Sequence, residues 1–148
     1  MTKESRVHNV RQILEEKGSE IWSVEPADLV IDAVRRMAEY GVGAMLVMED
    51  GRMVGMFTER DYARKVILAG RSSRETRVEE IMTTALVTLD PRATAEEGLA
   101  LMTRKRIRHL PVLDQGKLVG LVSIGDLVNA VIGDQRLLIE QLESYVRG

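Results

Sequence analysis

Apolar positions recur along the chain in an order that predicts alternating strands and helices. A short apolar stretch at 21–24 ends at a Glu-Pro pair, and Val30, Ala33, Val34 and Met37 then follow the i, i+3, i+4, i+7 spacing of a helix with one buried face. Two apolar runs at 44–48 and 53–57 are joined by a polar turn, which is the pattern of a β-hairpin. Since both runs are apolar at nearly every position, we expect them to be buried on both faces.

The same order of elements occurs again 65 residues later, as the offset from Pro26 to Pro91 shows. The second copy has a predicted strand at 86–89, a helix from about 95 to 102, and hairpin runs at 110–113 and 118–122. Each proline is expected to open the first helix of its copy, and Thr94 with Glu97 forms a capping-box pattern. Identical residues at this offset include the pairs Gly51 and Gly116, Gly55 and Gly120, and Asp61 and Asp126. The chain is therefore predicted to be a mixed α/β (α+β) protein built from two βαββα repeats.

Segment boundaries follow from this repeat. We place the first repeat at 10–70, a polar linker at 71–77, the second repeat at 78–133 and a C-terminal helix at 134–148, because 10–14 resembles 78–82 in sequence and the linker is rich in polar residues. In the last segment Leu138, Leu142 and Tyr145 lie on one helical stripe. Such a stripe can pack on the body of the protein or on a second subunit.

The most specific chemical signal is a pair of S/T-x-x-D sequences, Thr58-Glu-Arg-Asp61 and Ser123-Ile-Gly-Asp126, each placed where an apolar run ends and a helix begins. Backbone N–H groups at a helix start form an anion site. The aspartate offers two acceptor oxygens, which match the two donors of a ribose diol. The alternative interpretation is an ordinary helix cap, but recurrence at the same offset favours ligand binding.

These features together resemble a pair of cystathionine β-synthase (CBS) domains, over about residues 10–133. They are the proline before each helix, the hairpin with its glycine, the tandem S/T-x-x-D closures and the run from Ile107 to Val112. The resemblance implies two repeats related by a pseudo-twofold axis, helical extensions at both ends, a homodimer, and an adenosine-containing ligand (AMP, ADP, ATP or NAD(H)) bound between the copies.

The resemblance also implies a crossed set of binding residues. Ser123 and Asp126 would hold the ribose of one ligand, and the residues expected beside its base are Ile21, Trp22, Ser23, Val42, Gly43 and Ala44. Thr58 and Asp61 would serve the other ligand, with Val87, Thr88 and Ile107 beside its base. The expected phosphate contacts are Arg60, Arg108 and His109. Because Gly43-Ala44 stands where the second copy has Arg108-His109, the two sites are not expected to be equivalent.

Composition excludes several classes of site. The chain has no cysteine, which excludes disulfides and thiolate chemistry, and its formal charge of −2 gives no long-range attraction to nucleic acid. Its two histidines, His8 and His109, are too far apart in sequence to predict a zinc site. No P-loop sequence occurs, and no G-x-G-x-x-G opens a helix after a strand. No apolar run reaches the roughly 18 residues of a membrane helix, and the N-terminal residues are highly charged, so we expect a cytoplasmic protein.

We therefore expect a regulatory module that binds an adenine nucleotide and signals its occupancy to a separate, unidentified protein. A dimeric interaction scaffold that binds no small molecule is the alternative. An enzyme with His109 as base is disfavoured, because no activated nucleophile or paired carboxylates accompany it. A nucleic-acid partner is also not expected, since the basic run at 104–108 lacks the aromatic residues of a stacking surface.

Overall fold

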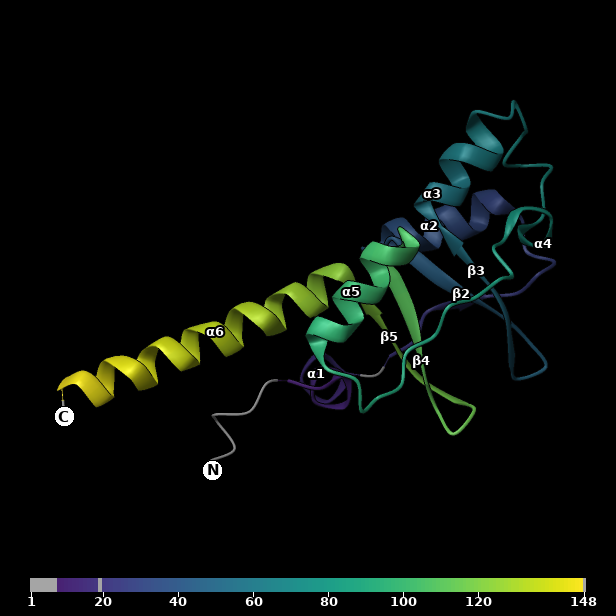
Figure 1. Ribbon diagram of the computed structural model, residues 1–148. Coiled ribbons are helices and arrows are strands. Elements are labelled where there is room, and N and C mark those ends of the chain that lie inside the picture. Colours follow the sequence, from purple (N-terminus) through teal and green to yellow (C-terminus); the bar gives the residue numbers. More distant parts are fainter. Residues whose placement is uncertain (1–7, 19, 148) are drawn as a thin grey trace. The chain divides into compact units, whose positions relative to one another are not determined.

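The structure is a computed structural model that describes residues 8–18 and 20–147 (Figure 1). The chain divides into two compact units: unit 1 comprises 1–20 with 87–148, and unit 2 comprises 21–86. Both units combine helices with a sheet, which confirms the mixed α+β class and the two repeats. Gly148, the last residue of the predicted C-terminal helix, lies outside the described residues, as do 1–7 and residue 19.

Unit 2 is a three-stranded sheet with helices. Its elements are β1 (Ser23–Val24), α2 (Val30–Tyr40), β2 (Ala44–Glu49), β3 (Arg52–Thr58), α3 (Glu59–Asp61), the π-helix η2 (Tyr62–Ile67) and α4 (Val78–Ile81). The short β1 pairs in parallel with β2, and β2 pairs antiparallel with β3. At the hairpin turn Asp50 and Gly51 both have positive φ, 52° and 76°, as a two-residue hairpin loop that matches the twist of its strands requires. The predicted hairpin and helix stripe of this repeat are confirmed.

Unit 1 repeats the hairpin and adds longer helices. Its elements are α1 (Val10–Lys17), α5 (Ala95–Lys105), β4 (His109–Asp114), β5 (Lys117–Ser123) and α6 (Ile124–Arg147). The β4–β5 turn again has two residues of positive φ, Gln115 at 50° and Gly116 at 81°. The predicted capping box is also present, since Thr94 Oγ1 accepts from Glu97 N and the Glu97 side chain accepts from Thr94 N.

Three local predictions are wrong. The segment 86–89 forms no strand; Leu89 makes only an isolated parallel bridge to Val112. The prolines do not open the helices: α2 and α5 start four residues after Pro26 and Pro91, α5 at the predicted Ala95, and the carbonyls of the two prolines accept hydrogen bonds from α4 and α1. The C-terminal helix is not a separate element, since α6 runs without interruption from Ile124 to Arg147; the exposed Gly133 costs a helix only about 1 kcal/mol and does not end it.

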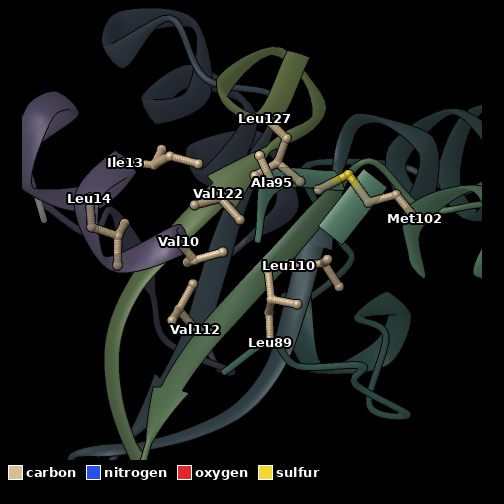
Figure 2. Packing of buried hydrophobic residues seen from close by; sticks show 10 residues of the cluster. All are labelled: Val10, Ile13, Leu14, Leu89, Ala95, Met102, Leu110, Val112, Val122 and Leu127. Carbon is tan, nitrogen blue, oxygen red and sulfur yellow. The ribbon is translucent and has the colours of Figure 1, made fainter. Parts of the chain in front are cut away.

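The helices α1 and α4 stand at the start of the first and the second repeat in sequence, and we call them the leading helices. Each packs with the hairpin of the other repeat. In unit 1, Val10, Ile13 and Leu14 of α1 belong to the core that contains Leu110 and Val122 (Figure 2). In unit 2, Val78 and Ile81 of α4 belong to the core around Phe57. Hence α1 completes the core of the second repeat and α4 completes the core of the first.

The turns at the two prolines hold these helices in the same way. Pro91 O accepts a hydrogen bond from Arg11 N in α1 (2.9 Å), and Pro26 O accepts one from Glu79 N in α4 (2.9 Å). The segment predicted as a linker also contributes to unit 2: Thr76 is buried, and its carbonyl accepts from Val30 N (2.9 Å) at the start of α2. These bonds satisfy backbone groups that the helix starts would otherwise leave without partners.

Candidate functional site

Both S/T-x-x-D sequences cap a helix. Thr58 Oγ1 accepts from Asp61 N (3.1 Å), and Asp61 Oδ2 accepts from Thr58 N (3.0 Å). In the second repeat Ser123 Oγ accepts from Asp126 N (3.2 Å), and Asp126 Oδ2 accepts from Ser123 N (2.8 Å). Capping is therefore a role of both pairs. What further role each aspartate can have depends on the hydrogen-bonding capacity that capping leaves.

Asp61 uses its whole carboxylate within unit 2. Its side chain is 7% exposed. Besides Thr58 N, its Oδ2 accepts from Thr58 Oγ1 (3.1 Å), while Oδ1 accepts from Thr83 Oγ1 (3.0 Å) and lies 2.9 Å from Lys65 Nζ. A carboxylate has about four acceptor positions, and these four contacts fill them. Asp61 is thus a buried side chain whose contacts all lie within unit 2.

Asp126 is more open and has a different cationic partner. Its side chain is 22% exposed, and Lys17 Nζ of α1 lies 2.7 Å from its Oδ2. The same ammonium donates to Leu121 O (3.1 Å). Partial burial opposes ionisation of Asp126, but the bonds from Lys17 and from Ser123 N outweigh it, and the pKa of Asp126 is lowered. The bonds from Lys17 and from Ser123 N both end on Oδ2, and the Ser123 hydroxyl also contributes to the lowered pKa of Asp126. With 22% of its side chain exposed against 7% for Asp61, Asp126 is the more accessible of the two carboxylates.

In each unit the hairpin places two more of the predicted residues next to the S/T-x-x-D sequence. In unit 1, His109 pairs with Ser123 in the β4–β5 register, and Ile124 N donates to Arg108 O (2.9 Å). In unit 2, Ala44 pairs with Thr58, and Glu59 N donates to Gly43 O (3.1 Å). The backbone around the two sites is therefore alike, while the side chains differ: the Asp126 site has Arg108 and His109 where the Asp61 site has Gly43 and Ala44.

The remaining predicted residues lie elsewhere in the two units. In unit 2, Ile21 and Trp22 precede β1, Ser23 begins it, Val42 follows α2, and Arg60 is an exposed residue of α3. The Trp22 ring stacks on Tyr40, with centroids 3.9 Å apart and planes at 10°. In unit 1, Val87 and Ile107 pack against the core, and Thr88 is exposed. The crossed grouping of residues from the two repeats stays a prediction.

Sequence reasoning missed the lysines that pair with the two aspartates. Lys65 is four residues after Asp61, a spacing that brings side chains together on a helix, so the pair was visible in the sequence. Lys17 is 109 residues from Asp126. No local pattern relates the two, and only the packing of α1 in unit 1 brings them together.

The described part of the chain holds neither a metal-binding cluster nor a membrane-spanning helix. Within residues 8–18 and 20–147, no group of three or more His, Asp or Glu side chains is arranged to hold a metal ion. No helix among these residues is long and apolar enough to span a membrane.

Comparison with known proteins identifies the repeats. The family model "CBS domain" matches twice, at residues 9–67 and 78–133. A mitochondrial CBS domain-containing protein of Arabidopsis thaliana, CBSX3, is 42% identical over 136 residues, which is 88% of this chain and 66% of that protein, so the chain spans just under two thirds of this relative. A solved structure of a protein with CBS domains from Burkholderia ambifaria is 53% identical, with a TM-score of 0.83, and the match covers 86% of this chain and 96% of that one.

A more distant structure shows the same fold with ligands bound. The CBS domain pair of protein MJ0100, solved in complex with 5′-methylthioadenosine and S-adenosyl-L-methionine, is 22% identical with a TM-score of 0.74, and the match covers 86% of this chain and 98% of that one. At this identity the likeness concerns the fold alone. The two family matches, which together span most of the sequence, show that this chain belongs to the CBS-domain family.

Proposed function

We propose that this CBS pair is a regulatory module that binds an adenosine-containing ligand at Asp126 and Ser123 of unit 1. The observation that carries the proposal is the difference between the two aspartates. Asp61 is buried with four contacts to its carboxylate, whereas Asp126 is partly exposed, and its bonds from Lys17 and from Ser123 N both end on one oxygen, Oδ2. A carboxylate of this kind can accept both hydroxyls of a ribose diol.

The basic residues around Asp126 favour a ligand that carries phosphate. Arg108 and His109 lie on the segment that pairs with Ser123, and Lys17 contacts Asp126 directly. Charged donors make the stronger hydrogen bonds to phosphate oxygens. AMP, ADP, ATP and NAD(H) are the candidates, and the adenosine compounds bound to the CBS pair of MJ0100 support the ligand class.

The proposed output is a change in how the chain interacts with other proteins. A ligand shifts a conformational equilibrium by as much as its affinity differs between the two states. We expect a homodimer that passes this shift to a separate protein. Regulation is preferred to catalysis because the hydroxyls of Thr58 and Ser123 each accept the backbone N–H of a capping aspartate, which is a structural role.

The test is the melting temperature in the presence of AMP, ADP, ATP and NAD(H). Ligand at 100 times its Kd should raise the unfolding free energy by about 2.7 kcal/mol, and Asp126→Asn should abolish the rise. Asp114→Asn is the matched control, because Asp114 also pairs with a cation of α1, Arg11 at 3.1 Å, and it should leave the rise intact. Equal rises in the wild type and in Asp126→Asn would contradict the proposal.

A ligand-independent dimeric scaffold is the second candidate. It is favoured by the apolar side chains that α6 leaves exposed, among them Leu138, Leu142 and Tyr145. This function predicts a stable dimer whose melting temperature does not respond to any of the four nucleotides.

A further inference from the structure

The C-terminal half of α6 carries an apolar face that no described residue of its own unit covers. Figure 1 shows the last turns of the helix extending beyond α1 and α5 of the same unit. Five apolar side chains in these turns are more than half exposed: Leu138 (56%), Ile139 (54%), Leu142 (56%), Tyr145 (86%) and Val146 (83%). Their three- and four-residue spacing puts them on one side of the helix.

This apolar face, 138–146, continues toward the start of α6. Ile132 and Val128, about two and three turns before Ile139 on the same side, are 41% and 37% exposed. The family match ends at residue 133, so most of the face lies beyond the part shared with the family. A monomer rarely exposes a contiguous apolar patch of more than a few hundred Å², which indicates that this face is covered in the working protein.

The charges beside the face favour one occupant. Arg136 and Glu143 lie along the same edge of it, one heptad apart, and neither forms an ion pair with any residue in the described part of the chain. In an antiparallel helix pair with twofold symmetry, equal edges of the two helices meet. An edge that carries one charge of each sign then complements itself.

We propose that the apolar face binds the same face of a second copy in an antiparallel helix pair, with the twofold axis crossing the apolar face at the level of residue 140, midway between Leu138 and Leu142. Leu138 then lies opposite the partner's Leu142, and Gln135 lies opposite the partner's Tyr145. Arg136 reaches the partner's Glu143, and symmetry makes each of these contacts twice. The assignment rests on the homodimer proposed above and names its contact surface.

A parallel pair fits the same residues less well. Opposite edges would meet, so Glu143 would face the partner's Gln141 and gain no cation. Arg136 would face the partner's Asp134, whose side chain is only 13% exposed and already contacts His8. The antiparallel pair gives a partner of opposite charge to Arg136 and to Glu143 of both copies, and the parallel pair does not.

The size of the overlap sets the expected strength. Two helix segments that overlap over 134–146 bury on the order of 1,000 Å² in total, the low end for a specific interface. We therefore expect a dimer that dissociates at concentrations on the order of micromolar. Its affinity should depend strongly on the few apolar residues at the centre.

Sedimentation equilibrium of charge-swapped variants tests the pairing. Arg136→Glu and Glu143→Arg should each weaken the dimer about tenfold, while the double variant R136E/E143R should restore the wild-type Kd to within about threefold. Arg104→Glu, an exposed charge reversal on α5, is the control and should change nothing. A double variant as weak as the single ones would overturn the antiparallel assignment.

Two further variants separate this surface from dimerisation elsewhere. L138Q/L142Q, both at exposed positions and both good helix formers, should weaken the dimer more than about 100-fold. A dimer that survives this change would overturn the assignment but leave the proposed homodimer standing; a monomeric wild type would overturn both. Because the chain has no cysteine, an oxidised mixture of Leu138→Cys and Leu142→Cys should cross-link only as the mixed pair, whereas Leu138→Cys cross-linking to itself would indicate the parallel arrangement.

Discussion

Gly55 and Gly120 have the same role in the two units: each lets another segment of its unit pack closely against a strand. A methyl group at Gly120 would lie 2.6 Å from Leu14 Cδ2 of α1, and one at Gly55 would lie 2.7 Å from Met82 Sδ and 3.0 Å from Thr83 O, just after α4. In each unit the strand glycine lets the leading helix or the chain after it approach closely. The repeated glycine in the sequence marks this contact.

The first prediction concerns this contact. Gly55→Ala should lower the free energy of unfolding by about 1–3 kcal/mol, because the added methyl group meets a backbone carbonyl that cannot move aside by changing rotamer. Gly133→Ala is the control: nothing lies near that helix position, and the change should stabilise by about 0.5–1 kcal/mol. Urea denaturation measures both, and a neutral Gly55→Ala would show that the contact is not tight.

His8 links the segment before α1 to α6 by charge. Its Nδ1 contacts Asp134, its backbone N donates to Asp134 Oδ2 (2.9 Å), and its Nε2 lies 2.9 Å from Glu16 Oε1. The Asp134 hydrogen bond is the main cause of a raised His8 pKa; partial burial works in the opposite direction, and Glu16 adds to the rise. A raised folded-state pKa means that the folded state holds the proton more tightly than the unfolded chain.

The second prediction follows from that sign. The stabilisation from His8 should be complete below the unfolded pKa of about 6.5 and should be lost as pH rises through the higher folded-state value. His8→Gln should remove this part of the pH dependence, so the difference in melting temperature between wild type and variant should shrink from about pH 6 to pH 9. Calorimetry across that range measures it. A constant difference would mean that the His8 charge contributes nothing.

At the level of secondary structure, local patterns predicted the elements better than their partners. The hairpins β2–β3 and β4–β5 and the stripe of α2 follow from periodicity and from Gly51 and Gly116, which are signals within a few residues. The strand predicted at 86–89 failed, because a strand needs a neighbour and Leu89 has only one bridge. The prediction that Pro26 and Pro91 open the helices failed, and the carbonyls of these prolines bind α4 and α1, which are distant in sequence.

The third prediction concerns α1 and α4, each of which packs with the hairpin of the other repeat. Leu14→Ala in α1 should cost about 2–5 kcal/mol and accelerate amide exchange first in β4 and β5 of unit 1, whose core includes Leu14. Ile81→Ala in α4 is the matched variant and should act first on β2 and β3 of unit 2. Hydrogen-exchange mass spectrometry locates the effect. Faster exchange in β2 and β3 on Leu14→Ala would contradict the assignment of α1 to unit 1.

For the whole molecule, the sequence repeat predicted the two candidate sites and their inequality, but not the contacts that distinguish Asp61 from Asp126. Thr58, Asp61, Ser123 and Asp126 follow from the offset of 65 residues, and the unequal pairs Gly43-Ala44 and Arg108-His109 already indicated that the sites are not equivalent. The cause of the inequality at the aspartates lay outside any pattern. Thr83 and Lys65 contact the buried carboxylate of Asp61, whereas Asp126 is partly exposed and pairs with Lys17, from the other end of the chain.

Native mass spectrometry of the purified chain with AMP, ADP, ATP and NAD(H) tests the central claim most directly, because it counts ligands per chain. The account predicts one adenosine-containing ligand per chain in the wild type and in Asp114→Asn, and none in Asp126→Asn with its fold confirmed by circular dichroism. A wild type that binds none of the four, or an Asp126→Asn variant that binds as many ligands as the wild type, would contradict it.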